Sequence, residues 1–74
     1  MKNISIVIPI YNETNRLNKL FKNILLLNTS FKIEFVFVDD GSNDNTVYKI
    51  ENFIKKFRKK KYKLKLIKSK KNLG

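Results

Sequence analysis

The fold of this chain is decided by residues 35–46, which read FVFVDDGSNDNT. Four apolar, mostly β-favouring residues lead directly into Asp39 and Asp40, then into a Gly-Ser-Asn-Asp turn and an amphipathic run that can begin a helix. This order predicts a strand, an acidic tip and a helix. In an open α/β sheet, ligands bind beyond the carboxyl ends of the strands, so we expect both carboxylates at a binding edge.

The polar residues of this turn also have a structural interpretation. Carboxylate, amide and hydroxyl side chains at a strand end often shape the turn or cap the next helix, and we favour that role for Ser42, Asn43 and Asp44. Asp39 differs because it ends an apolar strand and comes too early to cap a helix that begins near Asn45. We therefore favour a functional role for Asp39.

Length and composition narrow the possibilities. The 74 residues form one small domain at most, and a chain of this size buries only about 60% of the surface that its unfolded form exposes. Cysteine and histidine are both absent. The chain therefore has no disulfide framework, no thiolate metal site, and neither the usual zinc ligand nor the usual general base.

The net charge of +11 is concentrated near the C-terminus. Basic and acidic side chains balance over residues 1–54, and the whole excess falls between Lys55 and Lys71. Such a block can attract nucleic acid or anionic lipid headgroups. A solvated face is the favoured alternative, because charge runs usually solvate and lysine and asparagine are abundant along the entire chain. We consider nucleic acid an unlikely partner.

No apolar stretch is long enough for a transmembrane helix. The longest, Ile6 to Ile10 and Ile24 to Leu27, are far shorter than the roughly 20 residues required. The N-terminal apolar run is also too short to resemble a secretory signal. We expect the protein in the cytoplasm or on the cytoplasmic side of a membrane.

The first half of the chain predicts a strand, a loop and a helix. Ile4 to Ile8 is a nearly continuous β-branched run, typical of a strand buried on both faces, and Pro9 is expected to end it. Apolar residues then recur with helical spacing from Leu17 to Leu25, which predicts a helix over about Glu13 to Leu27. Asn12 or Thr14 is expected to cap that helix.

The second half predicts another strand, a helix and a last strand. These are Ile33 to Val38, roughly Asn45 to Lys59, and Tyr62 to Leu66, where alternating lysines suit a sheet edge. The order is β-α-β-α-β, and right-handed crossovers place three parallel strands in the order 3-2-1. The fold class is therefore α/β, and the loops Pro9 to Glu13 and Asp39 to Asp44 should emerge at the same edge.

These two loops supply chemistry that suits a nucleobase. They hold an aromatic ring, amide and carboxylate groups and an acidic pair, which offer stacking and acceptors for ring N–H groups; the residues are Tyr11, Asn12, Glu13, Asp39 and Asp40. No P-loop or dinucleotide fingerprint is present. Tyr11 is equally consistent with a partly buried aromatic, and Glu13 with a helix N-terminal charge. An acidic pair also suggests Mg²⁺ binding, as in a phosphorylation receiver domain. A receiver ends its first strand in the acidic pair, whereas here the pair follows the second strand, so we set that alternative aside.

Three segments together carry a family resemblance: VIPIYNE at 7–13, VDDGSNDNT at 38–46 and KNLG at 71–74. With this spacing the chain resembles the N-terminal part of a family 2 glycosyltransferase with the GT-A fold. The Arg16-Leu17 pair and the Asp-Asn-Thr that ends the acidic loop bring it closest to dolichyl-phosphate β-glucosyltransferases and other polyprenyl-phosphate glycosyltransferases. The resemblance implies that residues 1–74 form the Rossmann-like, nucleotide-binding portion, about the first third of such an enzyme.

The resemblance also implies site residues and partners. Residues matching Pro9, Tyr11 and Glu13 line the nucleotide pocket, the carboxylate matching Asp39 hydrogen-bonds the base, and the position matching Asp40 supports the loop. The segment that includes Asn72 and Gly74 borders the donor site. The implied partners are a UDP- or GDP-hexose and, in the full enzyme, a polyprenyl phosphate, with possible membrane contact through Lys55 to Lys71.

Parts that the family needs for transfer are not in this sequence. Its Asp-x-Asp motif, which holds Mg²⁺ or Mn²⁺ on the donor diphosphate, follows the fourth strand, and the acceptor half and the general base come later still. We therefore expect no catalytic residue, no metal ligand and no bound cofactor in these 74 residues, and nucleotide binding without catalysis. The alternatives are a small basic module that binds nucleic acid or anionic membrane, and a truncated remnant that does not fold stably.

Overall fold

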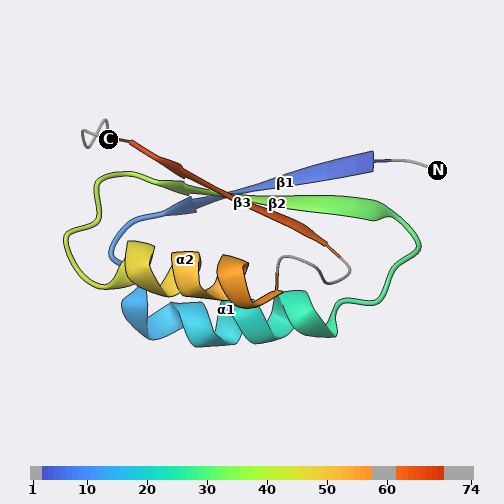
Figure 1. The fold of residues 1–74 in the computed structure, drawn as a ribbon, viewed down its shortest axis with the longest axis horizontal. Coiled ribbons are helices and arrows are strands. Elements are labelled where there is room, and N and C mark those ends of the chain that lie inside the picture. Colours follow the sequence, from blue (N-terminus) through green and yellow to red (C-terminus); the bar gives the residue numbers. More distant parts are fainter. Residues whose placement is uncertain (1–2, 58–61, 70–74) are drawn as a thin grey trace.

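A computed structural model describes residues 3–57 and 62–69, which form five elements (Figure 1). They are β1 (Asn3–Ile10), α1 (Thr14–Leu26), β2 (Lys32–Asp39), α2 (Thr46–Phe57) and β3 (Lys63–Lys68). Both strand pairs are parallel, and the sheet order is β1-β2-β3. This is the predicted 3-2-1 sheet counted from its other edge, so the α/β fold class is confirmed.

The molecule has two layers. Both helices lie against the same face of the sheet, and no described element covers the other face (Figure 1). This layering follows from the topology, because two β-α-β crossovers of the same hand that step in one direction place their helices on one side.

The core lies between the central strand and the two helices. Phe37 of β2, Leu17 of α1 and Ile50 of α2 are fully buried. The Phe21 ring stacks on Phe53 with centroids 4.0 Å apart, and both rings meet Phe37 edge-on. Aromatic pairs in these geometries contribute about 0.5–1.5 kcal/mol beyond their buried area. This cluster fixes α1 and α2 against β2, and so fixes the loops that precede both helices.

The expectation that the first strand is buried on both faces is wrong. The exposed fraction is 61% for Val7 and 36% for Ile6, whereas only Ile10 of this strand is buried. Among the described residues, β1 pairs with β2 alone and its far face has no cover. A continuous apolar run therefore forms an edge strand here.

Pro9 does not end β1, contrary to prediction, but lies within it opposite Val38. The backbone N–H of Asp40 donates to the Ile10 carbonyl at 2.9 Å, so Ile10 directs its backbone groups toward β2. Successive residues of a strand direct these groups to opposite sides, so Pro9 faces the open edge. Its missing N–H removes no ladder hydrogen bond there.

The start of α1 also differs from prediction. The N-cap is Glu13 and no side chain caps the helix, so neither Asn12 nor Thr14 has the expected role. The reason is tertiary, because the Asn12 side chain contacts the other loop and a hydroxyl from α2 accepts the Glu13 N–H. None of the described helices combines the length and apolar character needed to cross a membrane.

The later elements agree with prediction where they are described. β3 exposes Lys63 and Lys65 and half-buries the leucines between them, as a one-sided edge strand should. α2 is described as far as Phe57. The last residues predicted for that helix, 58 and 59, lie outside the described part of the chain. So do residues 58–61 and 70–71 of the lysine block, the basic segment from Lys55 to Lys71.

Candidate functional site

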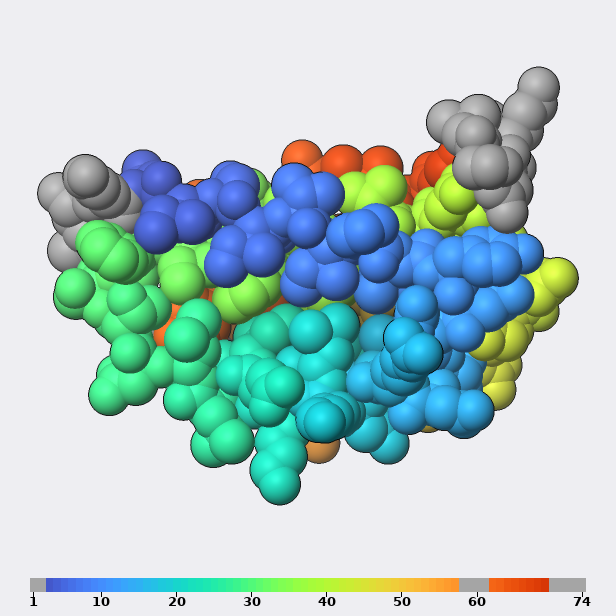
Figure 2. Space-filling view, turned by 180° about the vertical axis from the view of Figure 1, so that it is seen from behind, coloured from blue at the N-terminus to red at the C-terminus, as the bar shows by residue number. Residues whose placement is uncertain are grey.

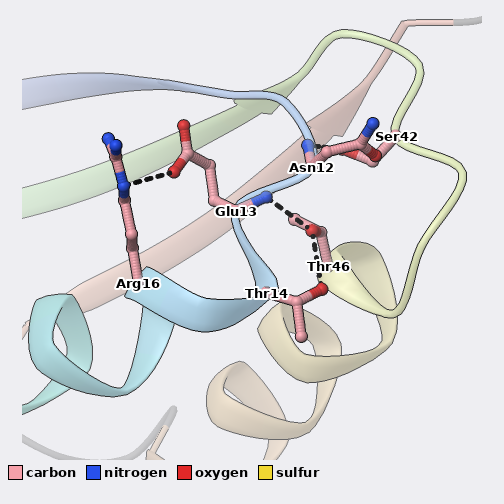
Figure 3. Close-up of polar contacts among 6 residues, drawn as sticks. All are labelled: Asn12, Glu13, Thr14, Arg16, Ser42 and Thr46. Carbon is pink, nitrogen blue, oxygen red and sulfur yellow. Dashed lines mark hydrogen bonds and ion pairs between the residues drawn. The ribbon is translucent and has the colours of Figure 1, made fainter.

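The loops that follow β1 and β2 are joined by hydrogen bonds at the carboxyl edge of the sheet. The backbone N–H of Asn12 donates to the Ser42 hydroxyl at 2.8 Å (Figure 3). The Asn12 side-chain oxygen in turn accepts the backbone N–H of Asn43 at 3.0 Å. The predicted meeting of the two loops is therefore confirmed, although they lie some thirty residues apart in sequence.

Asp39 organises the acidic loop from inside. Its side chain is only 2% exposed, and one carboxylate oxygen accepts the backbone N–H of Ser42 at 3.0 Å. The other oxygen accepts a hydrogen bond from the Ser42 hydroxyl. Ser42 thus accepts from Asn12 and donates to Asp39, which links both loops to a buried carboxylate.

Two residues in these loops have positive φ, and both allow the tight turns. Gly41 has φ 81°, which glycine adopts without a Cβ penalty, and Asn12 has φ 48°, a value that asparagine tolerates better than most residues. The Asn12 conformation directs its backbone N–H and its side chain at the partner loop.

A second set of contacts joins the first turns of the two helices. Thr46 is fully buried, and its hydroxyl accepts the backbone N–H of Glu13 at 2.9 Å and lies 3.3 Å from the Thr14 hydroxyl (Figure 3). Sequence reasoning missed Thr46 as a positioning residue. The position of Thr46 at a helix start indicates only a local cap. No residue near it in the sequence indicates that its hydroxyl accepts a backbone N–H from the start of the other helix.

Asp44 has the structural role that we favoured for it. Its carboxylate accepts the backbone N–H of Thr46 at 2.9 Å. Hydrogen bonding from the Thr46 hydroxyl, aided by that of Thr14 and opposed by desolvation, lowers the pKa of Asp44 from 3.8 to about 2. The carboxylate therefore stays ionised at neutral pH and stabilises the start of α2.

The remaining predicted site residues are more accessible. Pro9 is exposed, the Tyr11 ring is 44% exposed, and Asp40 is half-buried. The carboxylate of the half-buried Glu13 lies 3.6 Å from the exposed Arg16 guanidinium, an i,i+3 pair (Figure 3). Asn72 and Gly74 lie outside the described residues, so their predicted place beside the donor remains a prediction.

The acidic tip does not have the donor set of a cation site. Both oxygens of Asp39 already accept hydrogen bonds from Ser42. Within residues 3–57 and 62–69, no three carboxylates come together in a way that could hold a metal ion. Asp39 and Asp44 instead accept hydrogen bonds from backbone and hydroxyl groups of their own loop and of the start of α2.

Comparison with known proteins assigns the chain to a family. Residues 5–74 match the family Glycosyl transferase family 2. The chain belongs to this family. The sequence-level resemblance to family 2 glycosyltransferases is thereby confirmed, whereas the dolichyl-phosphate subtype is not tested by this match.

Two relatives of this family 2 chain are longer than it is. An uncharacterized glycosyltransferase from Synechocystis is 48% identical over 46 residues, which cover 60% of this chain and 14% of the relative. An uncharacterized protein from Methanocaldococcus jannaschii is 38% identical over 68 residues, or 92% of this chain and 27% of the relative. The chain therefore spans well under half the length of either relative. No solved structure is significantly similar to it.

Proposed function

We propose that the joined loops at the carboxyl edge bind the base of a nucleotide sugar, as the donor-side portion of a family 2 glycosyltransferase. The observation that carries this proposal is the Asn12–Ser42–Asp39 hydrogen-bond chain. It holds an exposed aromatic and an acidic tip in place before any ligand arrives, and such preorganisation reduces the ordering cost of binding. Family membership supports a nucleotide sugar as the ligand class.

In this proposal the two aspartates have different roles. Asp39 is buried with both oxygens bonded to Ser42, so it is a positioning residue. Asp40 lies at the same tip with a half-buried side chain, and we assign it the acceptor role toward the base. This exchanges the two roles that the family resemblance implies. Tyr11, with its exposed ring, supplies the stacking surface, and Pro9 and Glu13 flank it.

The acceptor chemistry indicates which bases fit. A carboxylate accepts hydrogen bonds and, when ionised, cannot donate them. Uracil and guanine carry a ring N–H on their pairing edge, whereas cytosine and adenine present an acceptor at the corresponding ring nitrogen. UDP- and GDP-sugars are therefore the proposed donors, and CDP- and ADP-sugars are disfavoured because their bases offer Asp40 no ring N–H.

The acceptor substrate and the catalytic groups are the other parts of the proposed reaction. In a longer enzyme, other residues would hold a divalent cation on the donor diphosphate and supply a general base. Both relatives are long enough to contain such residues. A polyprenyl phosphate acceptor is supported by the resemblance at Arg16-Leu17, and the excess positive charge between Lys55 and Lys71 would attract the anionic surface in which such a lipid resides.

The test is an NMR titration of the isotope-labelled chain with UDP, GDP and CDP. We expect UDP or GDP to shift the amide signals of Tyr11 and Asp40 saturably at millimolar concentration, while CDP has little effect. Asp40→Asn should weaken binding at least tenfold. Glu34→Gln is an equal change of charge towards the opposite end of β2, keeps an oxygen that can accept from Ser5, and should leave binding unaltered.

Two results would count against the proposal. One is a folded chain whose signals do not move with either nucleotide at several millimolar. The other is equal shifts with every nucleotide and with pyrophosphate, lost at high salt, which would assign the effect to the lysine block as a general polyanion contact.

A further inference from the structure

The side chain of Asn12 has a fixed orientation at the joined loops. The backbone N–H of Asn12 donates to the Ser42 hydroxyl at 2.8 Å, and its side-chain oxygen accepts the backbone N–H of Asn43 at 3.0 Å. A backbone N–H can only donate, so the carboxamide atom that faces Asn43 is the oxygen, and the NH₂ group is directed away from that contact. The two loops therefore determine where the amide protons of Asn12 lie.

This NH₂ group is accessible to a ligand. Asn12 is exposed, and within residues 3–57 and 62–69 no group accepts a hydrogen bond from its amide nitrogen. Its backbone φ of 48° lies in the left-handed region, which is unfavourable for residues other than glycine and is concentrated at functional sites. Figure 2 shows the loops after β1 and β2 side by side at one end of the molecular surface, where a ligand can reach them.

The Asn12 donor belongs to the same tip as the acceptor that we assigned to the base. Asn43, to which Asn12 bonds, comes three residues after Asp40, and the Asp40 N–H donates to the carbonyl of Ile10, two residues before Asn12. The tip thus offers a carboxylate acceptor and an amide donor. Uracil and guanine present the complementary pair, a ring N–H beside a carbonyl: N3–H and O4 in uracil, N1–H and O6 in guanine.

We propose that Asn12 is a specificity-determining residue, which donates from its NH₂ group to O4 of uracil or O6 of guanine while Asp40 accepts the neighbouring ring N–H. This inference rests on the proposed function. Cytosine and adenine carry an amino group in place of that carbonyl, so the Asn12 NH₂ group would meet a second donor. Two facing donors leave both groups unsatisfied, which is unfavourable. Asn12 therefore selects the same bases as Asp40, through a contact of the opposite polarity.

The test is an NMR titration of the parent chain and of Asn12→Asp with UDP, GDP and CDP. Aspartate tolerates a positive φ and its oxygen can still accept the Asn43 N–H, so the two loops should stay joined. The variant replaces the NH₂ donor with an acceptor, which suits the amino group of cytosine. We expect the ratio of UDP affinity to CDP affinity to fall at least tenfold. The two nucleotides carry the same charge, so the added carboxylate should not change this ratio through charge alone.

A matched variant and a modified base complete the test. Asn15→Asp makes the same change at an exposed position in the first turn of α1, and it should leave the ratio unaltered. The parent should bind 4-thio-UDP about fivefold more weakly than UDP, because sulfur is a weak acceptor, and Asn12→Asp should show no such preference.

The outcomes separate this inference from the proposed function. If neither UDP nor GDP binds the folded parent chain, the proposed function fails and this inference fails with it. If they bind, but Asn12→Asp has the same ratio of UDP to CDP affinity as the parent, only the role of Asn12 is overturned.

Discussion

At the scale of single residues, the site depends on one hydroxyl. Ser42 Oγ accepts the Asn12 N–H and donates to Asp39, so it bonds one loop to the other and both to the interior of the molecule. Hydrogen bonds to a charged acceptor contribute about 1.5–3 kcal/mol, more than neutral ones. A buried carboxylate that loses such partners destabilises the folded state. The Ser42 side chain therefore matters more for stability than its small size indicates.

Ser42→Ala should therefore lower the free energy of unfolding by about 1–3 kcal/mol, because it removes both hydroxyl contacts and leaves Asp39 short of a donor. Urea unfolding followed by circular dichroism measures the change. Ser30→Ala, at an exposed position between α1 and β2, should stay within about 0.5 kcal/mol of the parent. Equal stabilities for the two variants would contradict the proposed importance of Ser42.

Asp44 should make stability depend on pH in the acid range. Hydrogen bonds from Thr46 and Thr14 lower its folded pKa from 3.8 to about 2, so the folded state binds its proton later than the unfolded state does. The contribution is fully present above about pH 4 and is lost as pH falls toward 2. Thermal midpoints of the parent and Asp44→Asn between pH 2 and 5 test this. The parent should lose more stability than the variant, and parallel curves would exclude it.

At the scale of elements, β1 shows what an edge position permits. The strand is mostly apolar, yet it lies at the border of the described sheet and runs through a proline. The direction of each backbone N–H, toward β2 or toward the open edge, decides which residues the strand tolerates. Ile8 needs a backbone N–H because that group faces β2, whereas Pro9 can lack one because its backbone nitrogen faces the open edge.

Pro9→Ala should change the free energy of unfolding by less than about 1 kcal/mol, because it adds an N–H at the solvent edge and only modest unfolded-state entropy. Ile8→Pro removes an N–H that faces β2, so it should cost clearly more, at least about 2 kcal/mol with the lost packing included. Urea titrations of both variants give the comparison. Similar losses would mean that the assigned N–H directions are wrong.

Thr46 shows how α1 and α2 depend on each other. Thr46→Val keeps the buried volume but leaves the Glu13 N–H without its acceptor, and should cost about 1–3 kcal/mol. Thr46→Ser retains the hydroxyl and should cost less, mainly for the lost methyl group. If Val proves no worse than Ser in urea unfolding, the contact between the helix starts does not contribute to stability.

The sequence predicts the strands and helices of this fold well because their patterns are local. The apolar run before Asp39 and the helical spacing from Leu17 onward depend only on nearby residues. The burial of β1 was mispredicted because an apolar run looks the same in a central strand and in an edge strand. The cap of α1 was mispredicted because its acceptor, Thr46, comes from another helix.

The candidate site was predicted in part for the same reason. The meeting of the two loops follows from parallel strands, whose carboxyl ends share an edge, and this was confirmed. The division of roles between Asp39 and Asp40 depends on which side chain is buried, which local sequence does not determine. Aspartate side chains readily accept nearby backbone N–H groups in turns, and the Gly-Ser that follows the acidic pair is a local signal that could have indicated the positioning role of Asp39.

At the scale of the whole molecule, charge opposes compactness. A net charge of +11 on 74 residues, with the excess confined to the C-terminal part of the chain, produces self-repulsion that folding intensifies. The chain is also small, so its core has little stability to spare. Conditions that screen charge should therefore favour the folded state.

The thermal midpoint should rise by several degrees between 0.02 and 0.5 M NaCl at pH 7, since screening reduces repulsion among the lysines. Differential scanning calorimetry at one low protein concentration, with only the salt concentration varied, measures the rise. Replacing exposed Lys55 and Lys56 with glutamine should make the salt dependence shallower. A midpoint that falls with salt would instead mean that attractive ion pairs stabilise the fold more than repulsion among the lysines destabilises it.

The parallel strand order also decides how this chain responds to force. β1 begins at one end of the sheet and β3 finishes at the other, so the two ends of the described chain lie on opposite sides (Figure 1). A pull on both ends would load the β1–β2 and β2–β3 ladders in shear, with the hydrogen bonds of each ladder sharing the tension. A protein of modest thermodynamic stability should then resist extension strongly, and a motor that draws it through a pore would have to break a whole ladder at once.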